Sequence, residues 1–180
     1  NKTATYGGPG GSIFDDTIKA RGQPVVSSIK IRTADRVNQI GLTLSNGVVL
    51  NHGGEDGTLQ ILDLEEDDYI KQIEMSIDDT GVSDDRVFAI RFTTNNGLTI
   101  EGGTWNGDYY NIEATEGNQI ICLHGRSGDE IDSLGAIIAP VPEEPEVIPF
   151  ITVYEDINYA GYEVTLPFGE YSLSDLRSHG

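Results

Sequence analysis

The chain has 180 residues, of which 30 are acidic and 11 basic, giving a formal net charge of −19. So negative a chain repels phosphate groups, which argues against nucleic acid and anionic membranes as partners. Its 37% of hydrophobic residues can fill one ordinary core and leave a remainder. Its 22 Gly and 8 Tyr, without a sustained helical period, favour strands and turns. The acidity fits either a solvated surface or scattered calcium ligation.

A glycine-rich cluster recurs three times along the chain. It reads Gly7-Gly8-Pro9-Gly10-Gly11-Ser12, then Gly53-Gly54-Glu55-Asp56-Gly57-Thr58, then Gly102-Gly103-Thr104-Trp105-Asn106-Gly107-Asp108. The spacing of 46 to 50 residues indicates an internal three-fold repeat.

An acidic turn followed by a strand recurs in step with the glycine clusters, at residues 35–40, 85–90 and 129–134. After the first two turns, alternating residues lead to Asn46-Gly47 and Asn96-Gly97, which are typical of tight hairpins. The turn that belongs with the first glycine cluster comes last in the chain. We therefore expect the N-terminal and C-terminal strands to share one sheet.

Three copies of a four-stranded unit with one apolar face must pack around a common axis to bury those faces. The prediction is an all-β fold, a three-sided β-prism of three Greek-key four-stranded sheets with pseudo-three-fold symmetry. The predicted strands cover residues 27–32, 38–45, 48–52, 59–63, 70–77, 87–94, 98–101, 111–113, 119–124 and 131–138.

The chain offers no sign of an enzyme or a membrane span. The three histidines His52, His124 and His179 have no Ser or Cys partner at a recognisable spacing and form no metal-ligand motif. No stretch approaches the roughly 18 apolar residues of a spanning helix, so we expect no membrane insertion. The single Cys122 lies in an apolar run that is typical of a buried strand.

Two segments resemble jacalin-related lectins. One is Gly-Gly-Pro-Gly-Gly-Ser-Ile-Phe-Asp-Asp near the start, and the other is Leu-His-Gly-Arg-Ser-Gly-Asp-Glu-Ile-Asp-Ser-Leu-Gly-Ala-Ile at residues 123–137. The resemblance covers about residues 4–140. It implies a sugar site between a Gly-x-x-x-Asp turn, here residues 128–132, and the early glycine loop at Gly11.

The chemistry of those residues suits a hexose. Neighbouring hydroxyls need an ionised acceptor, which Asp132 would supply as a surface group, and backbone N–H donors. Asp129 and Glu130 would supply these donors while their side chains face outward. Glycine at Gly128 and Gly11 lets the backbone approach the ligand closely. The same five residues in isolation could form an ordinary hairpin turn, since turns use Gly and Asp anyway.

The repeat places Asn38 and Phe88 where the first site has Asp132. Asn38 keeps an uncharged acceptor, so a weaker second site is predicted from Asp35, Arg36, Asn38 and Gly57, while Phe88 leaves no acceptor for a third. We expect the loop at residues 79–85 to border the first site. Within the family, galactose binding goes with cleavage just before the glycine-rich strand. The uncut residues 1–10 therefore imply mannose or glucose.

A Pro- and Glu-rich linker at residues 140–149 separates the predicted lectin domain, residues 1–139, from residues 150–180. The last segment is similar to a βγ-crystallin Greek-key motif, with Tyr154 followed seven positions later by Gly161. The motif is incomplete, and about 31 residues cannot bury a β-core. Either the chain is a fragment or a second chain completes the Greek key. The resemblance implies calcium at Glu155 and Asp156.

The leading hypothesis is a non-enzymatic lectin that binds glycans or glycoproteins, needs no cofactor for sugar binding and is extracellular or secreted. A homo-oligomer would supply avidity if one site works per chain. The alternatives are a calcium-binding structural or interaction protein of the βγ-crystallin type, and the targeting module of a larger toxin or hydrolase.

Overall fold

The computed structural model describes residues 1–79, 85–143, 150–156 and 160–167. Within those residues the regular structure consists of β-strands alone, which confirms the all-β prediction. Among them, no helix has the length and apolar character needed to cross a membrane.

Twelve strands belong to the first compact unit, residues Asn1–Pro142. They are β1 (Tyr6–Gly7), β2 (Ser12–Asp15), β3 (Val26–Thr33), β4 (Val37–Leu44), β5 (Val49–Gly53), β6 (Thr58–Asp63), β7 (Ile70–Asp79), β8 (Asp85–Thr94), β9 (Thr99–Gly103), β10 (Asp108–Glu113), β11 (Asn118–Ser127) and β12 (Ile131–Pro140).

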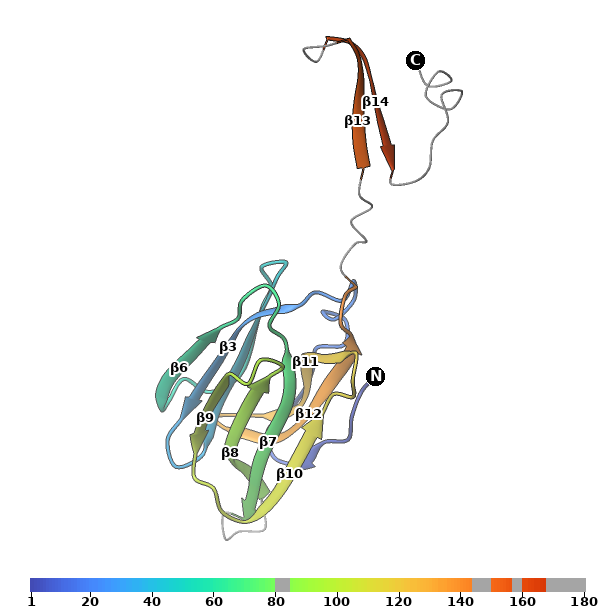
Figure 1. Cartoon of the computed structure of the whole chain (residues 1–180). Helices are drawn as coiled ribbons and strands as arrows, with labels where there is room; N and C mark the ends of the chain where they lie inside the picture. The colour runs from blue at the N-terminus through green and yellow to red at the C-terminus, as the bar shows by residue number, and fades with distance from the viewer. Residues whose placement is uncertain (80–84, 144–149, 157–159, 168–180) are drawn as a thin grey trace. The chain divides into compact units, whose positions relative to one another are not determined.

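The strands form three antiparallel groups of four, each with the same order (Figure 1). The first group is β2-β11-β12-β1, the second is β6-β3-β4-β5 and the third is β10-β7-β8-β9. In each, the last strand returns to lie beside the first, which is a Greek key. One pairing, Ile120 with Ile70, joins the first and third groups into a continuous eight-stranded sheet. The prediction of three separate sheets did not include this join.

The chain ends of the repeat meet in the first group, as predicted. β1 pairs with β12 through Tyr6 and Leu134, and β2 pairs with β11 from Ser12 to Asp15. Ahead of β1, the backbone N–H of Thr3 donates to the carbonyl of Ala136 at 2.9 Å. Residues 1–15 therefore supply the two outer strands of a sheet whose central hairpin comes more than 100 residues later.

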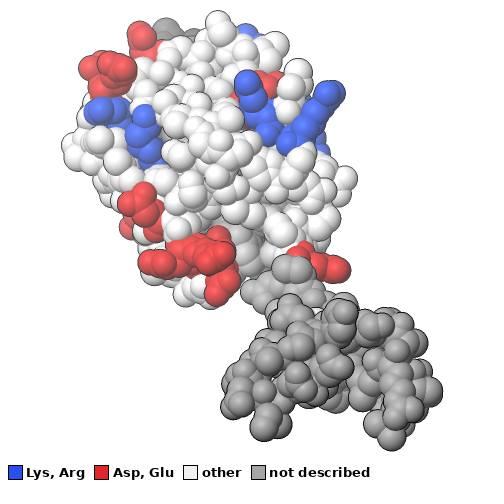
Figure 2. All heavy atoms as spheres, turned by 90° about the horizontal axis from the view of Figure 1, so that it is seen from above, with Lys and Arg blue, Asp and Glu red and all other residues white. Residues whose placement is uncertain are grey.

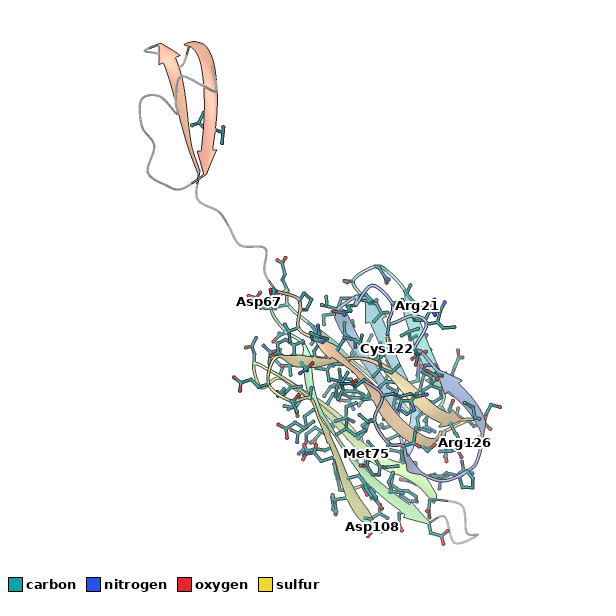
Figure 3. All side chains as sticks on the ribbon, turned by 90° about the vertical axis from the view of Figure 1, so that its right-hand side faces the viewer. Arg21, Asp67, Met75, Asp108, Cys122 and Arg126 are labelled. Atoms are coloured by element: carbon teal, nitrogen blue, oxygen red, sulfur yellow. The ribbon has the colours of Figure 1, made fainter. Side chains whose placement is uncertain are left out.

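The core lies between the three groups, because each strand directs alternate side chains inward. Fully buried side chains come from every group and include Ile29, Ile40, Ile73, Phe92 and Ile120. Met75 and Cys122 lie in the interior of this unit (Figure 3). Burial raises the pKa of the Cys122 thiol to about 12, so the thiol stays protonated and inert.

The second compact unit, residues Glu143–Gly180, contains one described hairpin. It consists of β13 (Phe150–Asp156) and β14 (Ala160–Pro167). The calcium residues predicted from the crystallin resemblance, Glu155 and Asp156, fall at the end of β13, and their side chains lie outside the description. In the first unit, β12 extends to Pro140, and Val141 N–H still bonds to Gly117.

Candidate functional site

The three-fold repeat is visible in the backbone of the glycine loops. The N–H groups of Gly8, Gly54 and Thr104 donate to the carbonyls of Asp132, Asn38 and Phe88, respectively, at 2.9 to 3.0 Å. These bonds pair each glycine loop with the turn that the sequence alignment assigned to it. Asp132, Asn38 and Phe88 are therefore structurally equivalent positions.

Gly11 and the turn at residues 128–132 come together around a pocket of about 450 Å³. Gly128 N–H donates to the Glu130 carbonyl at 3.0 Å, which closes the turn. All five residues predicted for the sugar site line this pocket, together with two arginines that were not assigned to it. The lining residues are Gly11, Arg36, Arg86, Gly128, Asp129, Glu130 and Asp132.

Gly11 is confined to glycine by the carboxylate beneath it. Its φ is +58°, and a Cβ there would lie 2.4 Å from Asp132 Oδ2 and 2.4 Å from the Ser127 carbonyl carbon. Such contacts are far inside van der Waals distance, so a side chain would displace either the carboxylate or the strand. The Asp132 carboxylate and the glycine loop are therefore fitted to each other.

Asp132 is more deeply set than its expected role as a surface acceptor suggests. Its side chain is fully buried, and Arg86 Nη1 donates to its Oδ1. Burying a carboxylate is tolerable only with such a partner. The expectation that Asp132 is a surface group is wrong, because Arg86 from the third copy covers it.

Three equivalent turn positions meet beside the pocket. Glu130, Arg36 and Arg86 each lie two residues before Asp132, Asn38 and Phe88. Arg36 binds Glu130 through both ends of its guanidinium, at 2.8 and 2.7 Å, and Arg86 Nε lies 3.6 Å from Glu130 Oε2. The hydrogen bond to Glu130 raises the pKa of Arg36.

This arrangement gives Arg36 and Glu130 contacts that the sequence did not indicate. Arg36 was predicted for the second site, yet it lines the first pocket. The Glu130 side chain, which was expected only to face outward, is the anchor for both arginines. The signal available in the sequence is the alternation of charge at one repeat position, Glu in one copy and Arg in the other two.

A third arginine holds the glycine loop. Arg126 on β11 donates from Nε to the Gly10 carbonyl at 2.7 Å and from Nη2 to the Gly11 carbonyl at 2.9 Å. Arg32 does the same more weakly in the second copy, with Nη1 at 3.4 Å from the Gly57 carbonyl. In the sequence, Arg126 stood inside the family signature without an assigned role.

The second pseudo-site keeps the backbone and loses the charge. Gly57 has φ +83°, and a Cβ there would lie 2.7 Å from Asn38 Oδ1. Gly11 has the same relation to the Asp132 carboxylate in the first site. Asn38 is buried, and its Oδ1 has no hydrogen-bond partner among the residues that the structure describes. Ala34 N–H bonds to the Arg36 carbonyl at 3.0 Å, which repeats the first turn, and Asp35 is exposed.

The third pseudo-site has an aromatic ring in place of an acceptor. Phe88 is partly buried, and the Arg36 guanidinium lies over its ring, with Cζ 5.7 Å from the centroid. Residues 80–84 of the predicted bordering loop lie outside the described residues. Arg86, which follows that loop, lines the first pocket.

Charged groups on the surface are mixed in sign. Basic side chains on the face shown in Figure 2 form small groups beside acidic ones. Across the parts of the chain that the structure describes, no three His, Cys, Asp or Glu side chains are arranged to hold a metal ion.

The model of the jacalin-like lectin domain matches residues 3–137, and the chain belongs to that family. Its members are carbohydrate-binding proteins without enzymatic activity, which confirms that the matched region is not an enzyme. Myrosinase-binding protein 2 of Arabidopsis thaliana is 29% identical over 150 residues, covering 78% of this chain and 22% of the relative. The chain thus spans less than a quarter of that protein.

Solved structures agree with the family match. Malaysian banana lectin superposes with a TM-score of 0.69 at 27% identity, covering 78% of this chain and 99% of the lectin. A mannose-binding jacalin-related lectin from Ananas comosus gives a TM-score of 0.66 at 22% identity, over 78% of this chain and 98% of its own. These superpositions confirm the jacalin-type β-prism. The family match ends at residue 137, so the crystallin resemblance of residues 150–180 stays a prediction.

Proposed function

We propose that this lectin domain binds mannose- or glucose-type sugars in the pocket between Gly11 and residues 128–132. The observation that carries the proposal is the contact between Asp132 and the glycine loop. A charged acceptor beside backbone that carries no side chain suits two adjacent hydroxyls of a pyranose. Arg36 pairs with Glu130, and Arg86 pairs with both Glu130 and Asp132. These pairs hold the carboxylate and the turn in place and neutralise the charge of both arginines.

The preference for mannose or glucose has two supports. Residues 1–10 run without interruption along β12 into the glycine loop (Figure 1). Family members that bind galactose instead have a cleaved chain whose free amino terminus enters the site. In addition, the Ananas comosus lectin that shares this fold is described as mannose-binding.

The test is a titration with methyl α-mannoside, methyl α-glucoside and methyl α-galactoside by calorimetry. We expect the first two to bind and the galactoside to bind at least tenfold more weakly. Stronger binding of the galactoside would contradict the proposed specificity, while the Asp132 pocket could still be the site.

We propose a weaker second sugar site at Asp35, Arg36, Asn38 and Gly57. It is supported by the buried, unpartnered Asn38 Oδ1 beside Gly57, which reproduces the first site without its charge. Replacing Asn38→Asp together with Ala34→Gly rebuilds the Gly-x-x-x-Asp turn. A hydrogen bond to a charged group contributes roughly 1.5–3 kcal/mol against about 1 for a neutral one.

The double variant should therefore raise the stoichiometry of methyl α-mannoside from about one toward two sugars per chain in calorimetry. A folded double variant that still binds one sugar would show that the second loop is not a site. Arg36 works against sugar binding at the second loop, since Glu130 holds its side chain at the first pocket.

Glycans or glycoproteins are the partners we propose, reached from an extracellular or secreted location and without a cofactor for sugar binding. Family membership supports the glycan partner. With one strong pocket in a domain, we further propose that a homo-oligomer supplies avidity.

A further inference from the structure

The returning strand of the second group, β6, carries exposed apolar side chains at the open edge of its sheet. It pairs with β3 on one side, and no strand of the described residues pairs with its other side (Figure 1). Leu59 and Ile61 are 42% and 57% exposed. Both point to the outer face, because Gln60 between them lies opposite the fully buried Ile31 of β3 and successive residues of a strand face opposite ways.

The repeat shows that this outer face is particular to the second copy. The strands β2, β6 and β10 each begin at the residue after a loop glycine, so their fourth residues are equivalent. Those residues are Asp15, Ile61 and Asn111. A charged or polar side chain on an edge strand hinders pairing with another chain. The second copy has an isoleucine where the other two copies have that protection.

The inner face of β6 differs in the opposite sense. The third residues of the same strands are Phe14, Gln60 and Tyr110, and the two aromatic rings pack against the core. Gln60 is exposed instead, and its Nε2 donates to the Glu101 carbonyl at 3.0 Å. In β6 the apolar residues have therefore moved from the inner face to the outer one, which is the arrangement of a strand that a partner covers from outside.

Nothing else in β6 protects its edge. The strand has no proline, no charged residue before Asp63 and no register shift in its pairing with β3. Edge strands of monomeric proteins usually carry a charge, a proline or a bulge that prevents further pairing. A chain with a net charge of −19 repels its own copies over most of its surface. The uncharged residues 58–62 are a place where two copies can approach each other.

We propose that β6 pairs in antiparallel orientation with β6 of a second copy of this chain, which makes a two-fold symmetric dimer. The backbone N–H and C=O groups on the open edge of one strand bond to the same groups of the other, so one surface serves both partners. This dimer deepens the homo-oligomer proposed above as the source of avidity, and it does not depend on the sugar site.

The side chains of β6 select one register for this pairing. A two-fold axis perpendicular to the sheet keeps both outer faces on the same side and places one residue opposite its own copy. With Gln60 at the axis, Leu59 lies opposite the partner's Ile61, and residues 58–62 overlap without any charge. With the axis at Ile61, Leu59 instead faces the partner's Asp63. With the axis at Leu59, only residues 58–60 overlap within the strand. The register centred on Gln60 is therefore the favoured one.

The experiment is sedimentation velocity of the full chain over a concentration series. A single strand pair is a small interface, so we expect the dimer to form at micromolar concentrations. Ile61→Asn introduces the residue that the third copy has at the equivalent position, and it should raise the dissociation constant of the dimer at least about tenfold. Ile13→Asn is the matched control, because Ile13 is 75% exposed on β2, and it should leave the dimer unchanged. An unmodified chain that stays monomeric throughout, or an equal effect of both variants, would overturn the proposal.

Cysteine cross-linking tests the register. Gln60→Cys places two thiols opposite each other across the axis, close enough for a disulfide, whereas Thr58→Cys lies opposite the partner's Leu62. The native Cys122 is buried and does not interfere. We expect oxidation to give covalent dimers of Gln60→Cys alone, and equal cross-linking of both variants, or none of either, would overturn the register.

Mannoside titration keeps the dimer separate from the sugar site. No residue of β6 lines the Asp132 pocket, so Ile61→Asn should bind methyl α-mannoside per chain as the unmodified protein does. Failure of the dimer is thus measured by sedimentation, and failure of the sugar site by calorimetry.

Discussion

Replacing Asp132→Asn tests the proposed pocket with the least disturbance to the fold. The asparagine keeps the size of the side chain, and its oxygen can still accept from Arg86. Arg86 also keeps Glu130, 3.6 Å from its Nε. The sugar loses a charged acceptor, and a charged hydrogen bond exceeds a neutral one by roughly 0.5–2 kcal/mol. We therefore expect a loss of about 0.5–2 kcal/mol in binding, or about two- to thirtyfold in Kd.

Asp132→Ala should be a poorer probe, because it leaves Arg86 with one carboxylate fewer at a buried position. Removing one partner of a buried pair costs roughly 3–5 kcal/mol, less here because a quarter of the Arg86 side chain is exposed and Glu130 remains. The Ala variant should thus lose stability as well as binding. Thermal unfolding of both variants separates the two effects.

The assay is calorimetry with methyl α-mannoside, and the matched control is Asp129→Asn. Asp129 is exposed and lines the same pocket, so this change removes one charge without touching the buried acceptor. We expect the control to bind within about twofold of the unmodified chain. If folded Asp132→Asn binds every sugar as well as the unmodified chain does, the acceptor has been assigned to the wrong residue.

Three further changes have defined outcomes. Gly11→Ala should weaken mannoside binding at least tenfold in calorimetry, because its Cβ would lie 2.4 Å from the pocket carboxylate, while Gly47→Ala, with φ +83° and open space, should not. Burial lowers the pKa of His124. The contribution of the neutral imidazole to stability is therefore present above about pH 6.5 and falls as the pH drops below that value. In thermal unfolding at pH 7.5 and pH 5, the His124→Gln variant should show a smaller drop in melting temperature than the unmodified chain. Calcium titrated into the full chain should shift NMR signals of Glu155 and Asp156, and unchanged signals there would remove the calcium prediction.

The repeat made most of the fold predictable, because glycines and turn residues recur at positions that backbone geometry fixes. Gly11, Gly57 and Gly107 all have positive φ, at +58°, +83° and +71°. The short strands β1 and β2 were not among the predicted strands. They lie on either side of a glycine-rich segment, and their partner strands come at the far end of the domain's sequence. Pairing of that kind leaves little local signal.

The part of the site that the sequence did not predict consists of contacts between different copies of the repeat. Whether Arg86 reaches Asp132 depends on how the three groups close around the axis, and periodicity within one group says nothing of that. The same holds for Arg36 and Glu130, which are 94 residues apart. A repeat alignment finds equivalent positions, but it does not reveal which copy supplies the wall of its neighbour's pocket.

The three copies pack in a ring, so the glycine loop of one copy contacts the turn of another. Gly8 of the first loop packs against Asp85 of the third turn, while Gly54 of the second loop bonds to Asp129 of the first turn at 3.2 Å. The first and third turns thus each also touch the glycine loop of a neighbouring copy. A residue change that weakens one site can therefore build another.

The residues that depart from the first copy show this exchange. Arg36 and Arg86 stand where the first copy has Glu130, and both extend to the first pocket, where they bind its acids. Had all three positions been glutamate, three carboxylates would repel one another at the axis. One acid with two arginines is the arrangement that holds Asp132 in place. The second and third copies have therefore not merely lost acceptors, because Arg86 of the third turn pairs with the buried Asp132 and Arg36 of the second turn holds Glu130 beside it.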